Sequence, residues 1–329
     1  MNFNFYMPSR VIFGKGSLNN LHKQKLPGIK KFSYLKRLEE QLDKANISHV
    51  LFDKILPNPI KEHVMEASNI VKKEKCDFII GIGGGSSIDS SKSIAIMSTN
   101  DGDYWDYIFG GTGKGKAIPN DPLPVVAITT TAGTGTEADP WTVITNGKEK
   151  IGFGYDKTYP FLSIVDPELM KTVPSKLTAY QGFDALFHST EGYINKIANE
   201  MSDLFALKSI ELIGKSLPKL EHGAGLIAIS REYYSLIADS HDCDEKMINM
   251  AKALGKKDAS KPMDFVEALV ELQKSCGVDN IKLSDYGIKK EDLPDIAKNS
   301  KFAMGGLYET DPHDFSDEDI LTILEKSYK

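Results

Sequence analysis

The sequence lacks long apolar runs, and no stretch approaches the roughly 20 residues that a membrane-spanning helix requires. The N-terminal residues show no cationic leader followed by an apolar segment, so we expect no secretory signal. The three cysteines, Cys76, Cys243 and Cys276, are scattered and odd in number, which argues against a disulfide framework and a structural zinc site. These absences predict a cytoplasmic protein with no membrane partner.

Basic tracts are also missing. The chain has 40 Lys and Arg against 46 Asp and Glu, and no basic stretch is interleaved with aromatic residues, so we expect no nucleic-acid partner. There is no GxSxG motif and no cysteine in basic surroundings, which argues against a serine or cysteine nucleophile. The length of 329 residues, with 41% hydrophobic and 26% charged residues, is typical of a globular protein with two domains.

The first half of the chain alternates short apolar runs with amphipathic segments. This alternation is typical of a parallel sheet covered by helices on both faces. The expected strands are 11–14, 49–53, 76–83, 123–129 and 161–166, the helices are 34–45, 60–74 and 86–98, and a hairpin joins 141–145 to 150–155. A doubly wound sheet would also have a strand just before the helix at 34, but the basic turn at 28–31 does not read as one.

After Pro174 nearly every segment has a helical period. The expected helices are 176–196, 201–216, 225–238, 244–254, 262–275 and 316–327. The last has an N-cap signature in Ser316 with Asp319 three residues later. We therefore predict a doubly wound, mostly parallel α/β nucleotide-binding domain over residues 1–173, and an all-α domain that binds metal and substrate over residues 174–329.

A glycine-rich passage, GIGGGSSIDSSK at 81–92, runs from an expected strand into an expected helix. Three successive glycines let the backbone approach a ligand closely, and the N–H groups at a helix start attract phosphate. Asp89 and Lys92 are expected to project from the first helical turn, where they could reach ribose, nicotinamide or phosphate. Ser86 stands where the Rossmann pattern GxGxxG has its last glycine, so a tight turn without a ligand is the alternative.

Two further stretches are rich in glycine or threonine. GGTGKGKA at 110–117 nearly spells a P-loop, but Ala117 replaces the Ser or Thr that would bind magnesium, so we interpret it as a mobile loop. TTTAGTGTEADP at 129–140 follows an apolar strand, and ligands bind at the carboxyl ends of strands in open α/β sheets. Its threonines could donate to a pyrophosphate or carboxamide, although a simple turn is equally compatible with this stretch alone.

A possible metal site lies in GFDALFHSTEGY, where Asp184 and His188 are one helical turn apart. A carboxylate and an imidazole so placed can bind a divalent cation. An isolated pair of this kind is more often an exposed ion pair, but the neighbouring phenylalanines and leucine indicate a half-buried helix. Glu191 shares the same helical stripe, and His222 in EHGAG is a second candidate ligand.

Taken together, five motifs occur in an order that resembles the iron-containing (group III) alcohol dehydrogenases, and their butanol-dehydrogenase-like branch in particular. These motifs are GGGSSIDSSK, TTAGTGTEADP, IVDPELM, GFDALFHSTEGY and HGAGL. FYMPSRVIFGKGSL and FDKILPNP are similar to the family's opening strand and its PNP turn, so the resemblance spans nearly the whole chain. It implies an α/β domain, a helical domain and a cleft between them, in agreement with the plan expected above.

The resemblance also implies a cofactor, NAD or NADP, and a metal ion, usually Fe²⁺ and in some members Zn²⁺. Asp184, His188 and His222 would be the metal ligands and thereby the catalytic residues. The implied cofactor-binding residues are Asn58, Gly84, Gly85, Ser86, Asp89, Thr130, Thr131, Thr134 and Lys150. The implied assembly is a homodimer or a larger homo-oligomer.

The sequence departs from the family in two places. Family members carry a further ligand histidine that has no counterpart here, because no histidine occurs from 189 to 221. The missing stretch would fall near Leu217–Lys219, and a second one, the strand and turn after GIKK, near residue 31. The implied function is interconversion of primary alcohols and aldehydes by hydride transfer. The alternatives are a zinc-dependent, glycerol-dehydrogenase-like enzyme and a non-catalytic nucleotide-binding relative.

Overall fold

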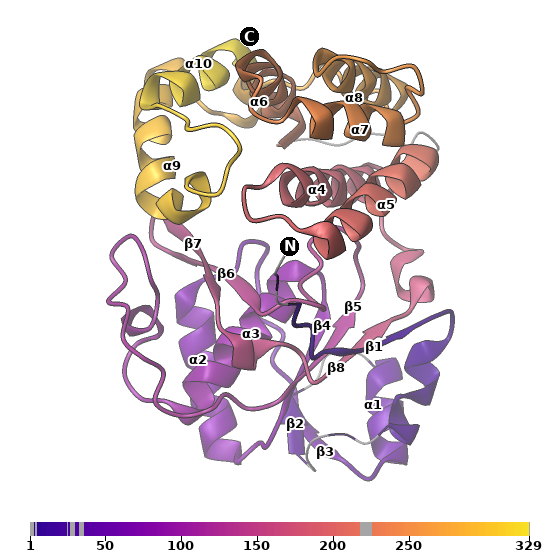
Figure 1. Cartoon of the computed structure of the whole chain (residues 1–329). Helices are drawn as coiled ribbons and strands as arrows, with labels where there is room; N and C mark the ends of the chain where they lie inside the picture. Colours follow the sequence, from indigo (N-terminus) through magenta and orange to yellow (C-terminus); the bar gives the residue numbers. More distant parts are fainter. Residues whose placement is uncertain are drawn as a thin grey trace. The chain divides into compact units, whose positions relative to one another are not determined.

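The computed structural model describes residues 3, 5–24, 26, 30–32, 36–217 and 226–328. The chain divides into two compact units, which are described separately (Figure 1). One comprises residues 6–172, and the other comprises residues 173–329 together with the first five. In the described part of the chain, no helix has the length and apolar character needed to cross a membrane.

The 6–172 unit is built on a parallel sheet, as expected. Its strands are β1 (Arg10–Phe13), β4 (Ile79–Gly83), β5 (Val125–Thr129) and β8 (Leu162–Val165). They lie in the order β1-β8-β5-β4, and every neighbouring pair is parallel. The expected antiparallel hairpin forms from β6 (Trp141–Asn146) and β7 (Glu149–Gly154).

The structure corrects the sequence analysis on one strand of this unit. β2 (Lys30–Phe32) precedes the first helix and pairs in parallel with β3 (Ser48–Val50). No strand was expected there, because two of its three residues are the lysines of the basic turn at 28–31, and the stretch has no apolar run. Backbone pairing to β3 defines this strand, and such pairing cannot be read from the side-chain pattern.

Helices cover both faces of the sheet. They are α1 (Lys36–Lys44), α2 (Lys61–Glu74) and α3 (Gly85–Thr99). α3 packs along β4 and β5, and α2 packs beside α3 (Figure 1). Successive residues of β4 point to opposite faces: Ile79 joins the core formed with α2 and α3, whereas Ile80 and Ile82 join the core formed with α1. Burial on both faces explains the continuous apolar strands of the sequence.

The other unit is helical, as expected. Its helices are α4 (Ser175–Ile194), α5 (Glu200–Ser216), α6 (Leu226–Ser240), α7 (Asp244–Ala253), α8 (Met263–Ser275), α9 (Leu293–Tyr308) and α10 (Asp317–Ser327). Their core is rich in aromatic rings, among them Phe187 stacked on Tyr234 and Phe265 edge-on to the same tyrosine. α10 begins with the expected capping box between Ser316 and Asp319.

Helix α9 was not expected from the sequence. Pro294 stands in its first turn, and two glycines near its end are poor helix formers. Proline is tolerated at a helix start, because the N–H it lacks would have no partner there. The buried side chains of Leu293 and Ala297 show that packing, rather than intrinsic propensity, stabilises this helix.

Candidate functional site

The glycine passage adopts the expected strand, turn and helix. β4 ends at Gly83, whose φ of +146° suits glycine, Gly84 is the N-cap and α3 begins at Gly85. A Cβ on Gly85 would lie 2.8 Å from Cγ2 of Thr134, and a Cβ on Gly84 would lie 3.0 Å from Oγ1 of Thr131. The absence of side chains therefore lets this turn lie directly against the threonine-rich stretch.

That stretch, residues 129–136, is called the threonine segment below. It begins at the carboxyl end of β5, the strand next to β4, where Thr129 lies opposite Gly83. The N–H of Thr130 donates to the carbonyl of Gly83 at 2.9 Å. The two segments that the sequence proposed for cofactor binding are thus brought together at one edge of the sheet, which is the edge where ligands bind in folds of this type.

The start of α3 is suited to an anion. No side chain caps its N-terminus, and its first turn has no acidic residue. The first N–H groups of a helix have no partner within the helix, and the helix dipole adds positive potential there. Ser86 is half-buried in this turn. Gly84, Gly85 and Ser86 therefore present the backbone expected of a phosphate site.

Lys92 and Asp89 differ in setting from what the sequence suggested. Lys92 was expected to reach a ligand, but its side chain is wholly buried, and its ammonium donates to Thr136, Asp139 and Trp141. Asp89 is 9% exposed and accepts from Oγ1 of Thr136 at 2.6 Å. Burial raises the pKa of Asp89 to about 6, although the Thr136 hydroxyl and the Lys92 charge oppose that rise.

Asn58 and Lys150 come together although they are far apart in the sequence. Nζ of Lys150 donates to Oδ1 of Asn58 at 2.8 Å. Asn58 has a φ of +57°, a left-handed conformation that asparagine tolerates better than most residues. Both side chains are exposed. Their contact with a cofactor remains a prediction.

The loop at 110–117 has the conformation of a turn and is not a P-loop, but it is more firmly held than expected. Lys114 and Lys116 both donate to the carboxylate of Asp106, at 2.6 and 3.1 Å. The N–H groups of Lys114 and Gly115 donate to the backbone carbonyls of Trp105 and Ile108. The two lysines lower the pKa of the Asp106 carboxyl to about 2. These lysines thus serve to fold the loop.

The proposed metal-binding pair lies on α4. Nδ1 of His188 is 3.9 Å from Oδ2 of Asp184, and their side chains are 52% and 29% exposed. This separation exceeds a hydrogen bond and is close to the roughly 3 to 3.5 Å that separates two ligands each about 2.1 Å from one dication. A carboxylate and an imidazole are donors that iron and zinc both accept. The two groups would have to approach each other by a few tenths of an ångström to share one dication, and their role as metal ligands stays a prediction.

The rest of the ligand set is not assembled in the described part of the chain. Among those residues, no group of three or more His, Cys, Asp or Glu could hold a metal ion. His222, the third proposed ligand, lies outside the described residues. Its role stays a prediction.

An apolar pocket of about 490 Å³ opens one turn beyond His188. Most of its walls are aliphatic or aromatic side chains from α4, α6, α9 and α10, including Phe187 and Tyr234. Glu191 lines it and keeps solvent access, but the surrounding protein raises the pKa of its carboxyl against the opposing effect of His188. The sequence placed Glu191 on the helical stripe of the metal pair but gave no sign of this pocket.

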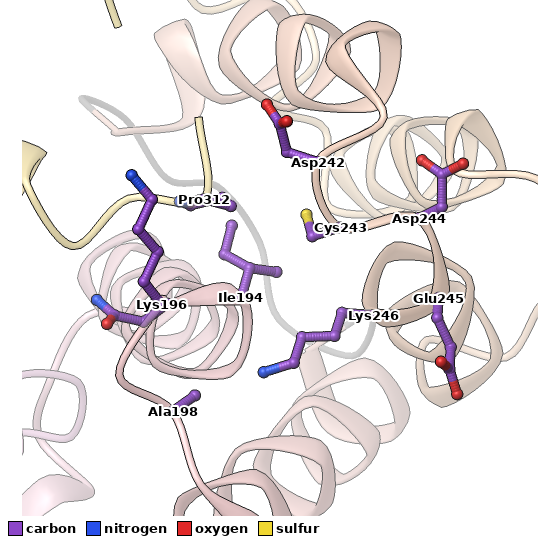
Figure 2. Close-up of a pocket in the computed structure, with 10 residues that line it drawn as sticks. Ile194, Lys196, Ala198, Asp242, Cys243, Asp244, Glu245, Lys246 and Pro312 are labelled. Carbon is purple, nitrogen blue, oxygen red and sulfur yellow. The ribbon is translucent and has the colours of Figure 1, made fainter. Parts of the chain in front are cut away.

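A second pocket, of about 460 Å³, surrounds Cys243 and is lined by both charged and apolar side chains (Figure 2). Its two lysines have partners: Lys196 donates to Asp314 at 2.6 Å, and Lys246 donates to the carbonyl of Tyr193 at 2.5 Å. Burial, reinforced by nearby carboxylates, raises the pKa of the Cys243 thiol to about 11. A thiol with that pKa is protonated at neutral pH and is a poor nucleophile, in line with the sequence analysis.

Comparison with known proteins identifies the family. Residues 8–167 match the model "Iron-containing alcohol dehydrogenase", and residues 178–232 and 220–328 match the model "Fe-containing alcohol dehydrogenase family, C-terminal". Alcohol dehydrogenase 4 of Schizosaccharomyces pombe is 40% identical over 230 residues, which cover 65% of this chain and 53% of that protein. In that alignment the chain thus spans about half of its relative.

Other relatives match over their whole length. Alcohol dehydrogenase 4 of Saccharomyces cerevisiae is 28% identical over 383 positions, covering 99% of this chain and 98% of that protein. Since 383 exceeds the 329 residues present here, that protein has segments that this chain lacks. A solved alcohol dehydrogenase from an archaeal halo-thermophilic source in a Red Sea brine pool has 28% identity, 99% coverage of both chains and a TM-score of 0.90. The chain therefore belongs to the iron-containing alcohol dehydrogenase family of enzymes.

Proposed function

We propose that this chain is an NAD-linked, Fe²⁺-dependent alcohol dehydrogenase that interconverts primary alcohols and aldehydes. The observation that carries the proposal is the meeting of the glycine passage and the threonine segment at the carboxyl ends of β4 and β5. This edge combines an uncapped helix start with threonine side chains, which suits a dinucleotide better than a simple turn.

Two relatives support NAD as the cofactor. One is an NAD-dependent methanol dehydrogenase of Bacillus methanolicus, 36% identical over 66% of this chain and 59% of that protein. The other is a probable NADH-dependent butanol dehydrogenase of Bacillus subtilis, 32% identical over 67% of this chain. The names describe those proteins, and we extend NAD to this chain on that similarity. The uncapped start of α3 supports a dinucleotide, because its free N–H groups can receive a pyrophosphate.

Each cofactor-binding residue has a proposed role. The N–H groups at the start of α3, from Gly84 to Ser86, bind the pyrophosphate. The threonine segment lines the cofactor through Thr130, Thr131 and Thr134, and the Lys150 ammonium approaches the ribose beside Asn58. Asp89 orders the nicotinamide side by fixing the end of the threonine segment. One of its carboxylate oxygens accepts a hydrogen bond from Thr136 at that end, and the other accepts one from the N–H of Val143 in β6.

Asp184 and His188 hold the metal ion in this proposal, with His222 as a third ligand. Bound Fe²⁺ supplies a Lewis acid that favours the alkoxide form of an alcohol or polarises an aldehyde. The chain's part is to hold that ion on the rigid helix α4, and the buried Phe183 and Phe187 fix the face from which both ligands project. The balanced reaction takes a hydride from the alcohol carbon to NAD⁺ and releases the hydroxyl proton to solvent, giving an aldehyde and NADH.

The pocket beyond His188 supports an apolar substrate. Its walls are mostly hydrocarbon, whereas a polyol would need hydrogen-bond partners along its whole length. A short aliphatic alcohol such as butanol therefore fits better than glycerol. We further propose a homo-oligomer, on family resemblance alone, which light scattering after size exclusion would measure.

The test is an activity assay on the full chain loaded with Fe²⁺ under anaerobic conditions. We expect NADH oxidation with butanal, slower oxidation with dihydroxyacetone, and no turnover in the variant Asp184→Ala, whose NADH affinity should be unchanged. Faster turnover of dihydroxyacetone with Zn²⁺ would instead support the glycerol-dehydrogenase-like alternative. Failure to turn over any aldehyde, with NADH still bound, would indicate a non-catalytic nucleotide-binding relative.

A further inference from the structure

The burial of Lys92 requires an explanation, because a wholly buried ammonium loses its hydration. The side chain projects from α3, two turns after Gly85, and it meets four oxygens that come 44 to 49 residues later in the chain. Nζ lies 2.7 Å from Oγ1 of Thr136, 2.8 Å from the carbonyl of Asp139 and 2.8 Å from the carbonyl of Trp141. Oδ1 of Asp139 is 3.0 Å away and supplies the opposite charge. An ammonium has three N–H groups, so each of them has an acceptor.

These bonds connect the two parts of the proposed cofactor site. α3 carries the glycine passage at its start, and the acceptors lie at the end of the threonine segment and just after it. The opposite end of that segment is fixed by the bond from the Thr130 N–H to the Gly83 carbonyl, at 2.9 Å. The residues between the two anchors include Thr131 and Thr134, which lie against Gly84 and Gly85. Lys92 is thus the distal anchor of the stretch that faces the cofactor.

Asp89 and Thr136 extend the same connection. The Thr136 hydroxyl accepts from Lys92 and donates to Oδ1 of Asp89 at 2.6 Å, while the N–H of Val143 donates to Oδ2 of Asp89 at 3.0 Å. One turn of α3 is therefore bonded to both the threonine segment and the first strand of the hairpin. A chain of charge-assisted hydrogen bonds in a buried setting has few alternative arrangements, so it fixes the segment in one position.

We propose that Lys92 is a positioning residue that holds the threonine segment against the glycine passage and thereby sets the affinity for the dinucleotide. The proposal rests on the proposed function, because it takes this edge of the sheet as the NAD site. Lys92 itself does not contact the cofactor, since its side chain is inaccessible and all of its donors are used. The energy that keeps the segment in place is supplied by folding, so binding NADH does not have to supply it.

The experiment compares Lys92→Met with Lys72→Met in the full chain. Lys72 is a suitable control because its ammonium also donates to a backbone carbonyl in the same unit, that of Asn100 at 2.8 Å, but away from the threonine segment. Two quantities are measured: the Kd for NADH by fluorescence, and amide hydrogen exchange in peptides that cover residues 129–141. We expect Lys92→Met to raise the Kd about tenfold or more and to speed exchange in those peptides before any ligand is added. Lys72→Met should change neither.

A second variant, Thr136→Val, keeps the shape of the side chain but removes the hydroxyl between Lys92 and Asp89. We expect this variant to raise the Kd for NADH about threefold. If Lys92→Met does not fold, Thr136→Val serves as the test of the proposal. Wild-type affinity in a folded Lys92→Met variant, or failing that in Thr136→Val, would overturn the proposal and leave the proposed function intact. If the wild-type chain itself binds no NADH, the proposed function fails, and this inference fails with it.

Discussion

Lys150 and Asn58 are joined by a 2.8 Å hydrogen bond across 92 residues of sequence. The lysine comes from the β6–β7 hairpin and the asparagine from the turn that precedes α2. Family resemblance proposed both for the cofactor without relating them to one another. The asparagine oxygen thus holds the lysine ammonium, and we propose that this places the ammonium for the proposed cofactor before it binds.

This arrangement predicts a specific effect of Lys150→Met. Loss of the ammonium should raise the Kd for NADH about tenfold, which corresponds to about 1.4 kcal/mol. The control is Lys148→Met, two residues earlier in the same hairpin and also exposed, which should leave the Kd unchanged. Fluorescence titration at low and high salt would measure both variants. Equal effects of the two substitutions would show that Lys150 contributes only net charge.

Gly85→Ala tests the close approach between the glycine passage and the threonine segment. The added Cβ would lie 2.8 Å from Cγ2 of Thr134, so either the Thr134 side chain or one of the two segments must shift. We expect the Kd for NADH to rise at least about tenfold, and the double variant with Thr134→Ser, which removes Cγ2 and keeps the hydroxyl, to recover part of that loss. Gly192→Ala is the control, because a Cβ there meets nothing within 4 Å. That change in α4 should stabilise the protein by about 0.5–1 kcal/mol without affecting NADH.

Metal binding can be tested with two histidines that have similar neighbours. His188 is paired with Asp184 one turn earlier, and His241 is paired with Asp244 one turn later, at 3.0 Å. We expect His188→Ala to lose bound Fe²⁺, as measured by elemental analysis after anaerobic loading and desalting, while His241→Ala retains the wild-type amount. Retention of iron by both variants would show that Asp184 and His188 are only a surface ion pair.

The sequence predicted the general plan because that plan depends on periodicity. Apolar runs of four to eight residues gave the central strands, and the helical stripes after Pro174 gave most of the second unit. β2 and α9 were missed because neither carries a strong pattern of its own: β2 is defined by pairing to β3, and α9 by packing of Leu293 and Ala297. Tertiary contacts decide such elements, and a single sequence does not display them.

The sequence predicted the segments of the candidate site but not how they meet. The glycine passage and the threonine segment could each be placed at the end of a strand, but their meeting depends on β4 and β5 being neighbours, which is a property of sheet order. Lys92 was misplaced because its acceptors lie far along the chain. The sequence did carry one signal, a single lysine among small and apolar residues on helix α3. The fold buries that helix on nearly all sides, and a buried charge needs partners.

The raised pKa of Asp89 predicts an unusual dependence of stability on pH. Its value of about 6 in the folded protein lies above the ordinary value of 3.8, mainly because burial disfavours the charged form. Between these two values the folded protein binds a proton that the unfolded chain releases. The contribution of Asp89 to stability is therefore fully present below about pH 3.8 and is lost as the pH rises through about 6.

Comparison with Asp89→Asn isolates this contribution, since every other titrating group is common to both proteins. We take the free energy of unfolding of the wild type minus that of the variant. As the pH falls from 7 to 4, this difference should increase by at most about 3 kcal/mol. Urea unfolding at pH 7, 6, 5 and 4 would measure the difference. A constant difference across this range would mean that Asp89 titrates normally, and so that its carboxylate is better compensated by Thr136 and Lys92 than its burial suggests. If the wild type instead lost stability relative to the variant as the pH fell, the pKa of Asp89 would be lowered in the folded protein, and Lys92 would be a net stabiliser of the charged form.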